Sequence, residues 1–278
     1  MKNVEELKPD DSCPTENFDT ELAKLSKKHA EAKDNVKFLS TLERQFKNID
    51  TGSPVEIEET LTSLMNGLKL VWIISRHIND DRMGKILRSI GNEIANKVAT
   101  DIKITEIFNK KADDAIDLLD KAINCMERWE QTYHITRKEI NDEGLDKRWE
   151  HTHKELFGRT GYMTGICKEL KEVIKVRKEF NILLGPELKA VIGDTEGIAL
   201  LTEEVYNLKT QFENITSDIF EETSRNQWDI TFESFKGKVT DIETQAIGLI
   251  TKTFKSELKS SERAFDLLQN FKNIMVNL

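Results

Sequence analysis

The chain has 278 residues and a net charge of −9, with 38% hydrophobic and 33% charged residues. This length allows one large domain or two ordinary ones, and the acidic balance excludes the concentrated basic surface that nucleic-acid-binding proteins need. Only 4 prolines and 13 glycines occur, which predicts long helices with few loops. No apolar run approaches the ~18–20 residues of a membrane span, and the N-terminus lacks an apolar signal core, so we expect a cytosolic protein without a membrane anchor.

The N-terminal residues 1–15 are polar, contain two prolines and predict a flexible end. A first long helix is expected over residues 16–48. Its apolar positions alternate spacings of four and three, which is the pattern of a coiled-coil seam. The seam comprises Phe18, Leu22, Leu25, His29, Ala32, Val36 and Leu39.

A turn and a strongly apolar helix follow. Gly52 can adopt a positive φ in the turn, and Ser53 with Glu56 forms a capping box that starts the next helix. From Leu68 to Ile74 apolar side chains surround this helix almost completely. A helix of this kind is normally enclosed by others, and Trp72 is expected in the core.

Two further helices are expected over residues 80–98 and 111–143. Gly84 and Gly91 lie seven residues apart on the first and indicate a close approach to another helix. The second carries many charges, so we expect it to be covered on one side only, and Gly144 ends it. A bend near Thr160 and a helix over residues 162–184 come next.

The C-terminal part contains a second heptad seam. After a helix over residues 195–212 and a loop in which Ile219 and Phe220 are tucked in, a long helix is expected over residues 223–258. Its apolar positions again alternate spacings of four and three. They are Trp228, Phe232, Phe235, Val239, Ile242, Ala246 and Leu249. The last segment, 260–278, includes Phe265, Leu268 and Phe271, for which we expect incomplete burial.

These patterns predict an all-α fold of elongated antiparallel helical bundles with long coiled-coil-like helices. We expect a flexible N-terminus at 1–15, a first bundle at 16–145 and a second bundle at 146–278. The second bundle ends directly after an apolar helix, which favours truncation inside a longer helical array.

No motif predicts catalysis, a metal site or a cofactor. Gly84-Lys85 and Gly237-Lys238 lack the strand and the glycine-rich loop of a phosphate site. His151 and His153 diverge on a helix instead of converging on one ion. The cysteines Cys13, Cys125 and Cys167 are far apart and odd in number, which indicates free thiols.

Apolar seams are what the sequence offers for binding. A heptad helix can bury one stripe internally or present it to a partner helix. The candidate partner-binding or core residues are Phe18, Leu22, Leu25, Trp228, Phe232, Phe235, Phe265, Leu268 and Phe271. The best functional class is therefore a structural or assembly module, although burial as internal core is the more common outcome for any one seam.

Several long collinear segments resemble the N-terminal tail region of dynein heavy chains, particularly axonemal ones. They span roughly residues 30 to 278. They include FLSTLER at 38–44, LMNGL at 64–68, VWIISRH at 71–77, LFGRT at 156–160, LGPELKAV at 184–191 and AFDLLQNFKNI at 264–274. None of these is a catalytic motif.

The resemblance implies a non-catalytic tail segment in an elongated stack of helical bundles. It implies a role in dynein complex assembly and microtubule-based movement, in the cytoplasm, cytoskeleton and cilium or axoneme. The implied partners are dynein intermediate chains, light intermediate or light chains and other heavy chains, with no nucleic acid, membrane or small-molecule substrate. The family's motor ATPase domains are absent. The alternative is a stand-alone helical adaptor or decayed paralogue that lacks the motor. Genomic sequence downstream of Leu278 would distinguish the two, since an open frame that continues into nucleotide-binding repeats favours the tail segment.

Overall fold

The computed structural model describes residues 15–74, 80–192, 195–215, 218–257, 264–266, 268–270 and 272. Within these residues the regular structure is helical and no strand occurs, which confirms the predicted all-α fold. The helices are α1 (Thr15–Ser40), α2 (Glu43–Thr51), α3 (Pro54–Ile74), α4 (Asp80–Asp101), α5 (Ile104–Ile107), α6 (Ala112–Asn141), α7 (His153–Leu183), α8 (Pro186–Val191), α9 (Thr195–Glu213) and α10 (Arg225–Glu257), with 3-10 turns η2 (Lys147–Trp149) and η3 (Glu222–Ser224). Apart from Thr15, the expected flexible segment 1–15 lies outside the described residues.

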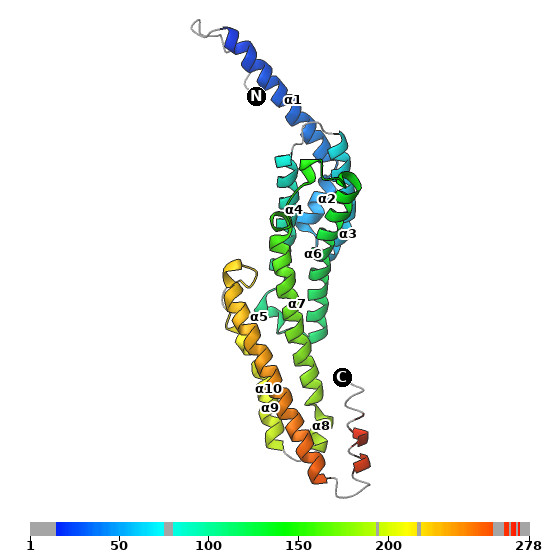
Figure 1. The fold of residues 1–278 in the computed structure, drawn as a ribbon, viewed down its shortest axis with the longest axis vertical. Helices are drawn as coiled ribbons and strands as arrows, with labels where there is room; N and C mark the ends of the chain where they lie inside the picture. The colour runs from blue at the N-terminus through cyan, green and yellow to red at the C-terminus, as the bar shows by residue number, and fades with distance from the viewer. Residues whose placement is uncertain are drawn as a thin grey trace.

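The molecule is elongated, and α1 projects from one end of it (Figure 1). Behind α1, the helices α3, α4, α6 and α7 form one packed group, with α6 against both α3 and α7, and α2 against α3 and α4. α6 nevertheless keeps an exposed stripe that includes Asp117, Lys121, Gln131 and Lys138, which agrees with the expectation that it is covered on one side only. Its covered face contacts two helices, and Trp129, which the seam pattern placed at its flank, is fully buried there.

The direction of each helix follows from the reversals of the chain. The neighbours α6 and α7 are antiparallel, since Asp113 pairs with Lys178 at one end and Glu130 contacts His153 at the other. The chain reverses its direction twice between α3 and α6, so these two helices run parallel. Arg128 of α6 donates a hydrogen bond to Thr62 of α3, and Trp72, further along α3, donates one to Asp146, just beyond the end of α6. The predicted antiparallel packing thus holds for helices that are neighbours in sequence, such as α6 and α7, whereas α3 and α6, which are further apart in sequence, are parallel.

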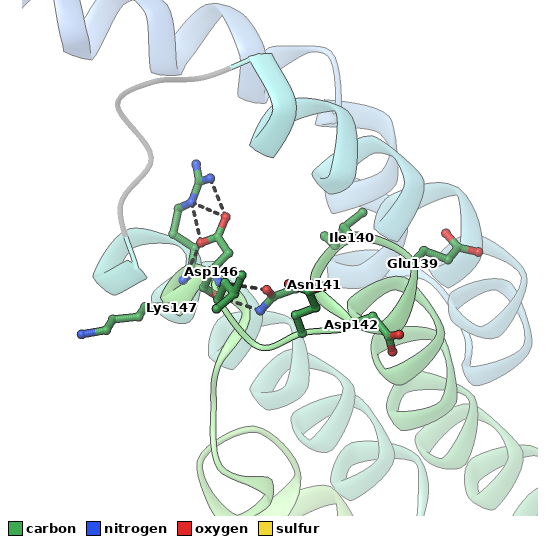
Figure 2. Close-up of a pocket in the computed structure, with 9 residues that line it drawn as sticks. Glu139, Ile140, Asn141, Asp142, Asp146 and Lys147 are labelled. Carbon is green, nitrogen blue, oxygen red and sulfur yellow. Dashed lines mark hydrogen bonds and ion pairs between the residues drawn. The ribbon is translucent and has the colours of Figure 1, made fainter.

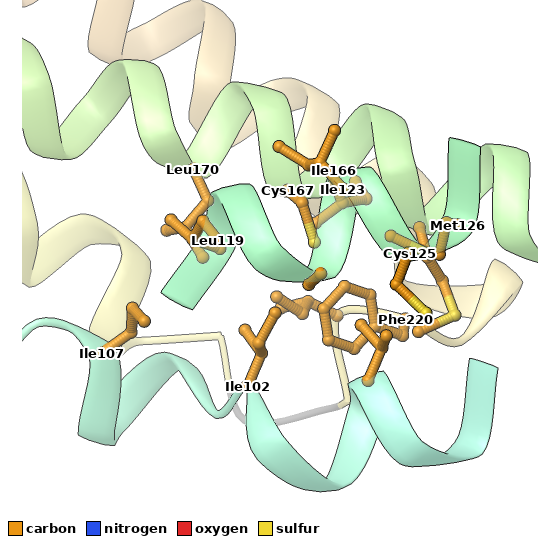
Figure 3. Packing of buried hydrophobic residues seen from close by; sticks show 14 of the residues in the cluster. Ile102, Ile107, Leu119, Ile123, Cys125, Met126, Ile166, Cys167, Leu170 and Phe220 are labelled. Carbon is orange, nitrogen blue, oxygen red and sulfur yellow. The ribbon is translucent and has the colours of Figure 1, made fainter. Parts of the chain in front are cut away.

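At the other end of the molecule, α7 packs against α9 and α10, and α5 packs against α9. The buried side chains form one continuous cluster. Figure 3 shows its middle, where Phe220 from the loop before η3 lies among Cys125, Met126 and Ile102. Ile219 and Phe220 are both buried, as predicted. Because α7 packs in both groups, the division into bundles at 16–145 and 146–278 stays a prediction about folding units.

The first helix is shorter than predicted. The expected helix 16–48 breaks at Thr41 and Leu42, so that α1 and α2 are separate. The reason is that the turn inserts Leu42 into the core against Gly67 of α3. A Cβ atom at Gly67 would lie 2.1 Å from Leu42 Cδ2. A heptad pattern continuing across the break could not reveal this turn.

By contrast, α7 is longer than predicted. It begins at His153, not at residue 162, and passes through the buried Thr160 without ending, so the predicted bend is wrong. Its start is fixed by a capping box in which Thr152 Oγ1 accepts from the Glu155 N–H and the Glu155 carboxylate accepts from the Thr152 N–H. This threonine–glutamate spacing is visible in the sequence and was the missed signal.

The predicted capping box at the start of α3 is confirmed, because Glu56 Oε2 accepts from the Ser53 N–H at 2.8 Å. The positive φ expected at Gly52 is wrong, because the φ of this residue is −74°. A glycine is required here by a close approach instead, since a Cβ atom at this position would lie 2.4 Å from the Asn48 carbonyl oxygen. The described glycine with positive φ is Gly144, in the loop after α6. The close approach predicted at Gly91 is confirmed, with the Leu156 carbonyl oxygen 3.1 Å from its would-be Cβ.

The central helix α3 is not enclosed on all sides. One face is fully buried, but Leu70, Ile73 and Ile74 are more than half exposed. The reason is that its neighbours α2, α4 and α6 cover one side of α3 and leave the opposite stripe open. Trp72 is half-buried at the edge of the core instead of inside it.

Candidate interaction surfaces

The apolar face of α1 is a helical stripe that the described residues leave open. We call Phe18, Leu22, Leu25, His29, Ala32 and Val36 the α1 seam. Every one of them is exposed, Phe18 by 59%, and no side chain of α1 belongs to the described buried core. Figure 1 shows why, since α1 extends away from the other helices.

The second heptad stripe, on α10, is buried instead of exposed. We call Trp228, Phe232, Phe235, Val239, Ile242, Ala246 and Leu249 the α10 seam. Phe212 of α9 packs on it, with ring centroids 5.3 Å from Trp228 and 5.7 Å from Phe235. The Trp228 indole N–H donates to Glu169 Oε2 on α7 at 2.5 Å. The structure thus places Trp228, Phe232 and Phe235 in the core, where they are not available to a partner.

The last predicted residues lie apart from both seams. Phe265 and Leu268 are 68% and 60% exposed, which confirms the incomplete burial predicted for this segment at these two positions. Phe271 lies outside the described residues. Whether these side chains or the α1 seam bind a partner stays a prediction.

A polar joint connects the end of α3 with the loop between α6 and η2. Asp146 accepts from the Trp72 indole N–H at 2.5 Å and from Arg148 Nη2 at 2.6 Å. Arg148 also lies over the Trp72 ring, 5.3 Å from its centroid. The hydrogen bonds from the side chain and backbone of Arg148 and from Trp72 hold the pKa of Asp146 below its usual value. The Asn141 amide secures the loop through both backbone polar groups of Asp146.

Beside this joint lies a hollow of about 570 Å³, lined by residues 139–143 and 145–148 (Figure 2). Glu139, Asp142 and Asp146 contribute carboxylates to it, and Figure 2 shows Asp146 and Asn141 bonded within the loop while Lys147 points outward. Glu139 in turn pairs with Lys69 of α3 at 2.9 Å. The carboxylates of Glu139 and Asp146 hold the loop against α3, so a structural role accounts for the polar residues that line the hollow.

The histidines do not form a metal site in the described part of the chain. His151 Nε2 contacts the Arg148 carbonyl oxygen, whereas His153 Nε2 lies 3.0 Å from Glu130 Oε1, so the two rings diverge as predicted. The structure instead brings His134 of α6 to the same Glu130 oxygen, at 3.6 Å. This cluster was not predicted, although the i, i+4 spacing of Glu130 and His134 on one helix is a signal for it. No group of three metal-ligating side chains suited to an ion occurs among the described residues.

Two of the three cysteines are buried in the core, as Figure 3 shows. Burial raises the pKa of Cys125 and Cys167 to about 12 each. Their thiols are therefore protonated at neutral pH and poor nucleophiles, in keeping with the predicted free structural thiols. Cys13 lies outside the described residues. Among the described helices, none is both long and apolar enough to span a bilayer.

Comparison with known sequences places this helical chain in a family. The sequence model described as dynein heavy chain, N-terminal region 1, matches residues 2–277. The dynein-1-alpha heavy chain of the flagellar inner arm I1 complex of Chlamydomonas reinhardtii is 40% identical over 98% of this chain, and human dynein axonemal heavy chain 10 is 38% identical over 93%. Mouse dynein axonemal heavy chain 8 is 24% identical over 91%.

This chain spans about 6% of the length of the first two relatives, and the matched family is their N-terminal region, not the motor. The match includes every residue of the α1 seam, the polar joint and the α10 seam. The chain therefore belongs to the dynein heavy chain N-terminal region 1 family.

Proposed function

We propose that this chain acts as a non-catalytic tail segment of a dynein heavy chain, a helical scaffold for assembly of a dynein complex. The observation that carries the proposal is the open α1 seam, an apolar helix face on a projecting element of a chain from this family. Apolar helix faces of this kind are typically buried against partner helices.

The proposed place of action is the axoneme of cilia or flagella. This is supported by the relatives, which are named as axonemal or flagellar dynein heavy chains. The proposed partners are intermediate chains, light intermediate or light chains and other heavy chains. In this role the chain supplies geometry alone: long paired helices set the spacing between the bound subunits.

Capture of dynein subunits from ciliary extract tests the proposal. We expect the immobilised chain to retain dynein subunits, identified by mass spectrometry, and the Leu22→Glu/Leu25→Glu variant to retain several-fold less. These two residues suit the test because they are exposed, so the variant should fold.

The matched control is Leu200→Glu/Tyr206→Glu, which changes two exposed apolar residues on α9 instead. It should retain as much as the unchanged chain. If the chain captures no dynein subunit, or if both variants lose the same amount, α1 is not the docking surface. ATP turnover by the purified chain would contradict the non-catalytic role.

A further inference from the structure

The start of α4 and the residues around η2 border a second hollow, which we call the α4–η2 cleft. The two elements pack against each other, and the cleft has a volume of about 600 Å³. Glycine apart, every residue that lines it has a side chain that is charged or can become charged. The lining residues are Asp81, Arg88, Gly144, Lys147, Glu150 and His151. The cleft therefore suits a charged ligand and not an apolar one.

The buried Gly84 of α4 brings two side chains of the cleft together. A Cβ atom at this glycine would lie 2.8 Å from His151 Cε1 and 3.1 Å from Arg88 Nη1. The imidazole and the guanidinium therefore share the space that a larger side chain would fill. Arg88 reaches this space because it follows Gly84 by one helical turn and side chains lean toward the helix N-terminus. The ring of His151 is held by its Nε2 atom, 3.0 Å from the Arg148 carbonyl oxygen.

The two carboxylates that line the cleft are already engaged by cations outside its lining. Asp81 Oδ2 pairs with Lys85 Nζ at 2.8 Å. Glu150 Oε1 accepts from Arg137 Nη2 at 2.6 Å. The charges of Lys85 and Arg137 thus offset those of the two acids, which leaves the remaining cations of the cleft to set its charge.

These remaining cations have no direct partner. The side chains of Arg88 and Lys147 make no hydrogen bond or ion pair with any residue that the structure describes. Glu155 is close enough to Arg88 to be influenced by its charge, but its carboxylate accepts from the Thr152 hydroxyl at 2.7 Å in the capping box of α7. Figure 2 shows the Lys147 side chain directed away from the polar joint. A guanidinium and an ammonium are therefore available in one cleft.

We propose that the α4–η2 cleft binds a phosphate monoester, with Arg88 as the main contact and Lys147 as the second. The forked donors of a guanidinium match the oxygens of a phosphate group, and an ammonium adds a point charge. The inference goes beyond the proposed scaffold function and does not depend on the α1 seam.

The shape and lining of the cleft narrow the class of ligand. A volume of about 600 Å³ leaves room for the molecule that carries the phosphate. The lining residues include no phenyl, phenol or indole ring on which a nucleobase could stack. A phosphorylated serine or threonine side chain on a polar peptide therefore fits the cleft better than a nucleotide does.

Phosphorus NMR of the full chain in 0.15 M salt tests the site. The probes are a polar pentapeptide that carries one phosphoserine, inorganic phosphate, and AMP. Because the cleft is open to solvent and the charges are screened, we expect saturable binding of the peptide with a Kd of roughly 1 mM. Inorganic phosphate should compete with the peptide, and AMP should bind no more tightly than inorganic phosphate.

Substitutions identify the contacts. Arg88→Gln should weaken binding of the phosphoserine peptide by roughly tenfold, because it removes charge-assisted hydrogen bonds. Lys147→Gln should weaken it by about threefold. Gly84→Ala leaves the net charge unchanged but intrudes on the Arg88 guanidinium and the His151 ring, so it should also weaken binding several-fold. Circular dichroism checks that each variant is folded.

The matched control is Lys175→Gln, which removes the same charge from α7. Lys175 is exposed, and its side chain likewise has no partner among the described residues. This variant should bind the phosphoserine peptide as the unchanged chain does.

Binding that does not saturate overturns the proposal, as does equal weakening by Lys175→Gln and Arg88→Gln, since either result would mean diffuse attraction to the surface. Tighter binding of AMP than of the peptide would make the ligand a nucleotide and also contradict it. Unchanged affinity of Gly84→Ala would show that the space above this glycine plays no part in the site.

Discussion

The α1 seam and the α10 seam have the same alternating spacing and opposite environments. The α10 seam is buried because α9 and α10 form a hairpin in which Phe212 packs between Trp228 and Phe235. α1 has no such neighbour among the described residues, because the turn at Leu42 directs α2 into the core and leaves α1 pointing outward. Heptad spacing therefore identifies an apolar stripe on a helix, whereas the connections of the chain decide what covers it.

The largest expected change in the free energy of unfolding comes from comparing one aromatic residue in each seam. Phe235→Ala removes a fully buried ring and should lower the free energy of unfolding by about 3–5 kcal/mol. Phe18→Ala removes the same ring from an exposed position and should change it by less than about 0.5 kcal/mol. Urea denaturation followed by tryptophan fluorescence measures both. Similar losses for the two variants would mean that α1 folds back onto the other helices in solution.

A pair of glycines sharpens the comparison between packed and open helix faces. A Cβ at Gly91 would lie 3.1 Å from the Leu156 carbonyl oxygen, so Gly91→Ala should destabilise the protein by about 1–3 kcal/mol. Nothing lies within 4 Å of the would-be Cβ at Gly237, so Gly237→Ala should stabilise it by up to about 1 kcal/mol through helix propensity. Thermal unfolding should move the two melting temperatures in opposite directions. Equal shifts would contradict the close approach of α4 and α7.

The polar joint, in which Asp146 contacts Trp72 and Arg148, gives a charged contact to set beside the apolar ones. The pKa of Asp146 is lowered in the folded protein, so its contribution to stability is present above the unfolded-state pKa and is lost as the pH falls through the folded-state pKa. Asp146→Asn should cost about 1–2 kcal/mol at pH 7. The difference from the unchanged chain should shrink below about pH 4. Denaturation at a series of pH values checks this, and a difference independent of pH would assign the effect to packing alone.

The smallest effect is expected at the C-terminal segment. Phe265 is 68% exposed, so Phe265→Ala should change the free energy of unfolding by less than about 0.5 kcal/mol. Leu184→Ala, which truncates a buried residue, is the comparison and should cost about 2–5 kcal/mol. A large loss at Phe265 would show that this side chain is covered in solution.

Local signals in the sequence predicted most helices and much of the core. The capping box at Ser53 and Glu56 marks the start of α3, and the seam of α10 gives both the helix and its buried face. Local patterns fail as predictors where a long-range contact overrides them. The break at Leu42 depends on a space above Gly67, and the open face of α3 depends on which sides α2, α4 and α6 occupy. For the candidate surfaces, spacing found both heptad stripes but could not tell that, within the described residues, the α10 stripe is buried and the α1 stripe is open.

The continuity of α7 has a mechanical consequence. Its 31 residues form one uninterrupted helix about 46 Å long, which packs against α4 and α6 at one end of the molecule and against α9 and α10 at the other. The Lys171–Asp120 and Lys178–Asp113 ion pairs also connect it to α6. A change in the angle between the two ends therefore requires this helix to bend, because no loop interrupts it between His153 and Leu183.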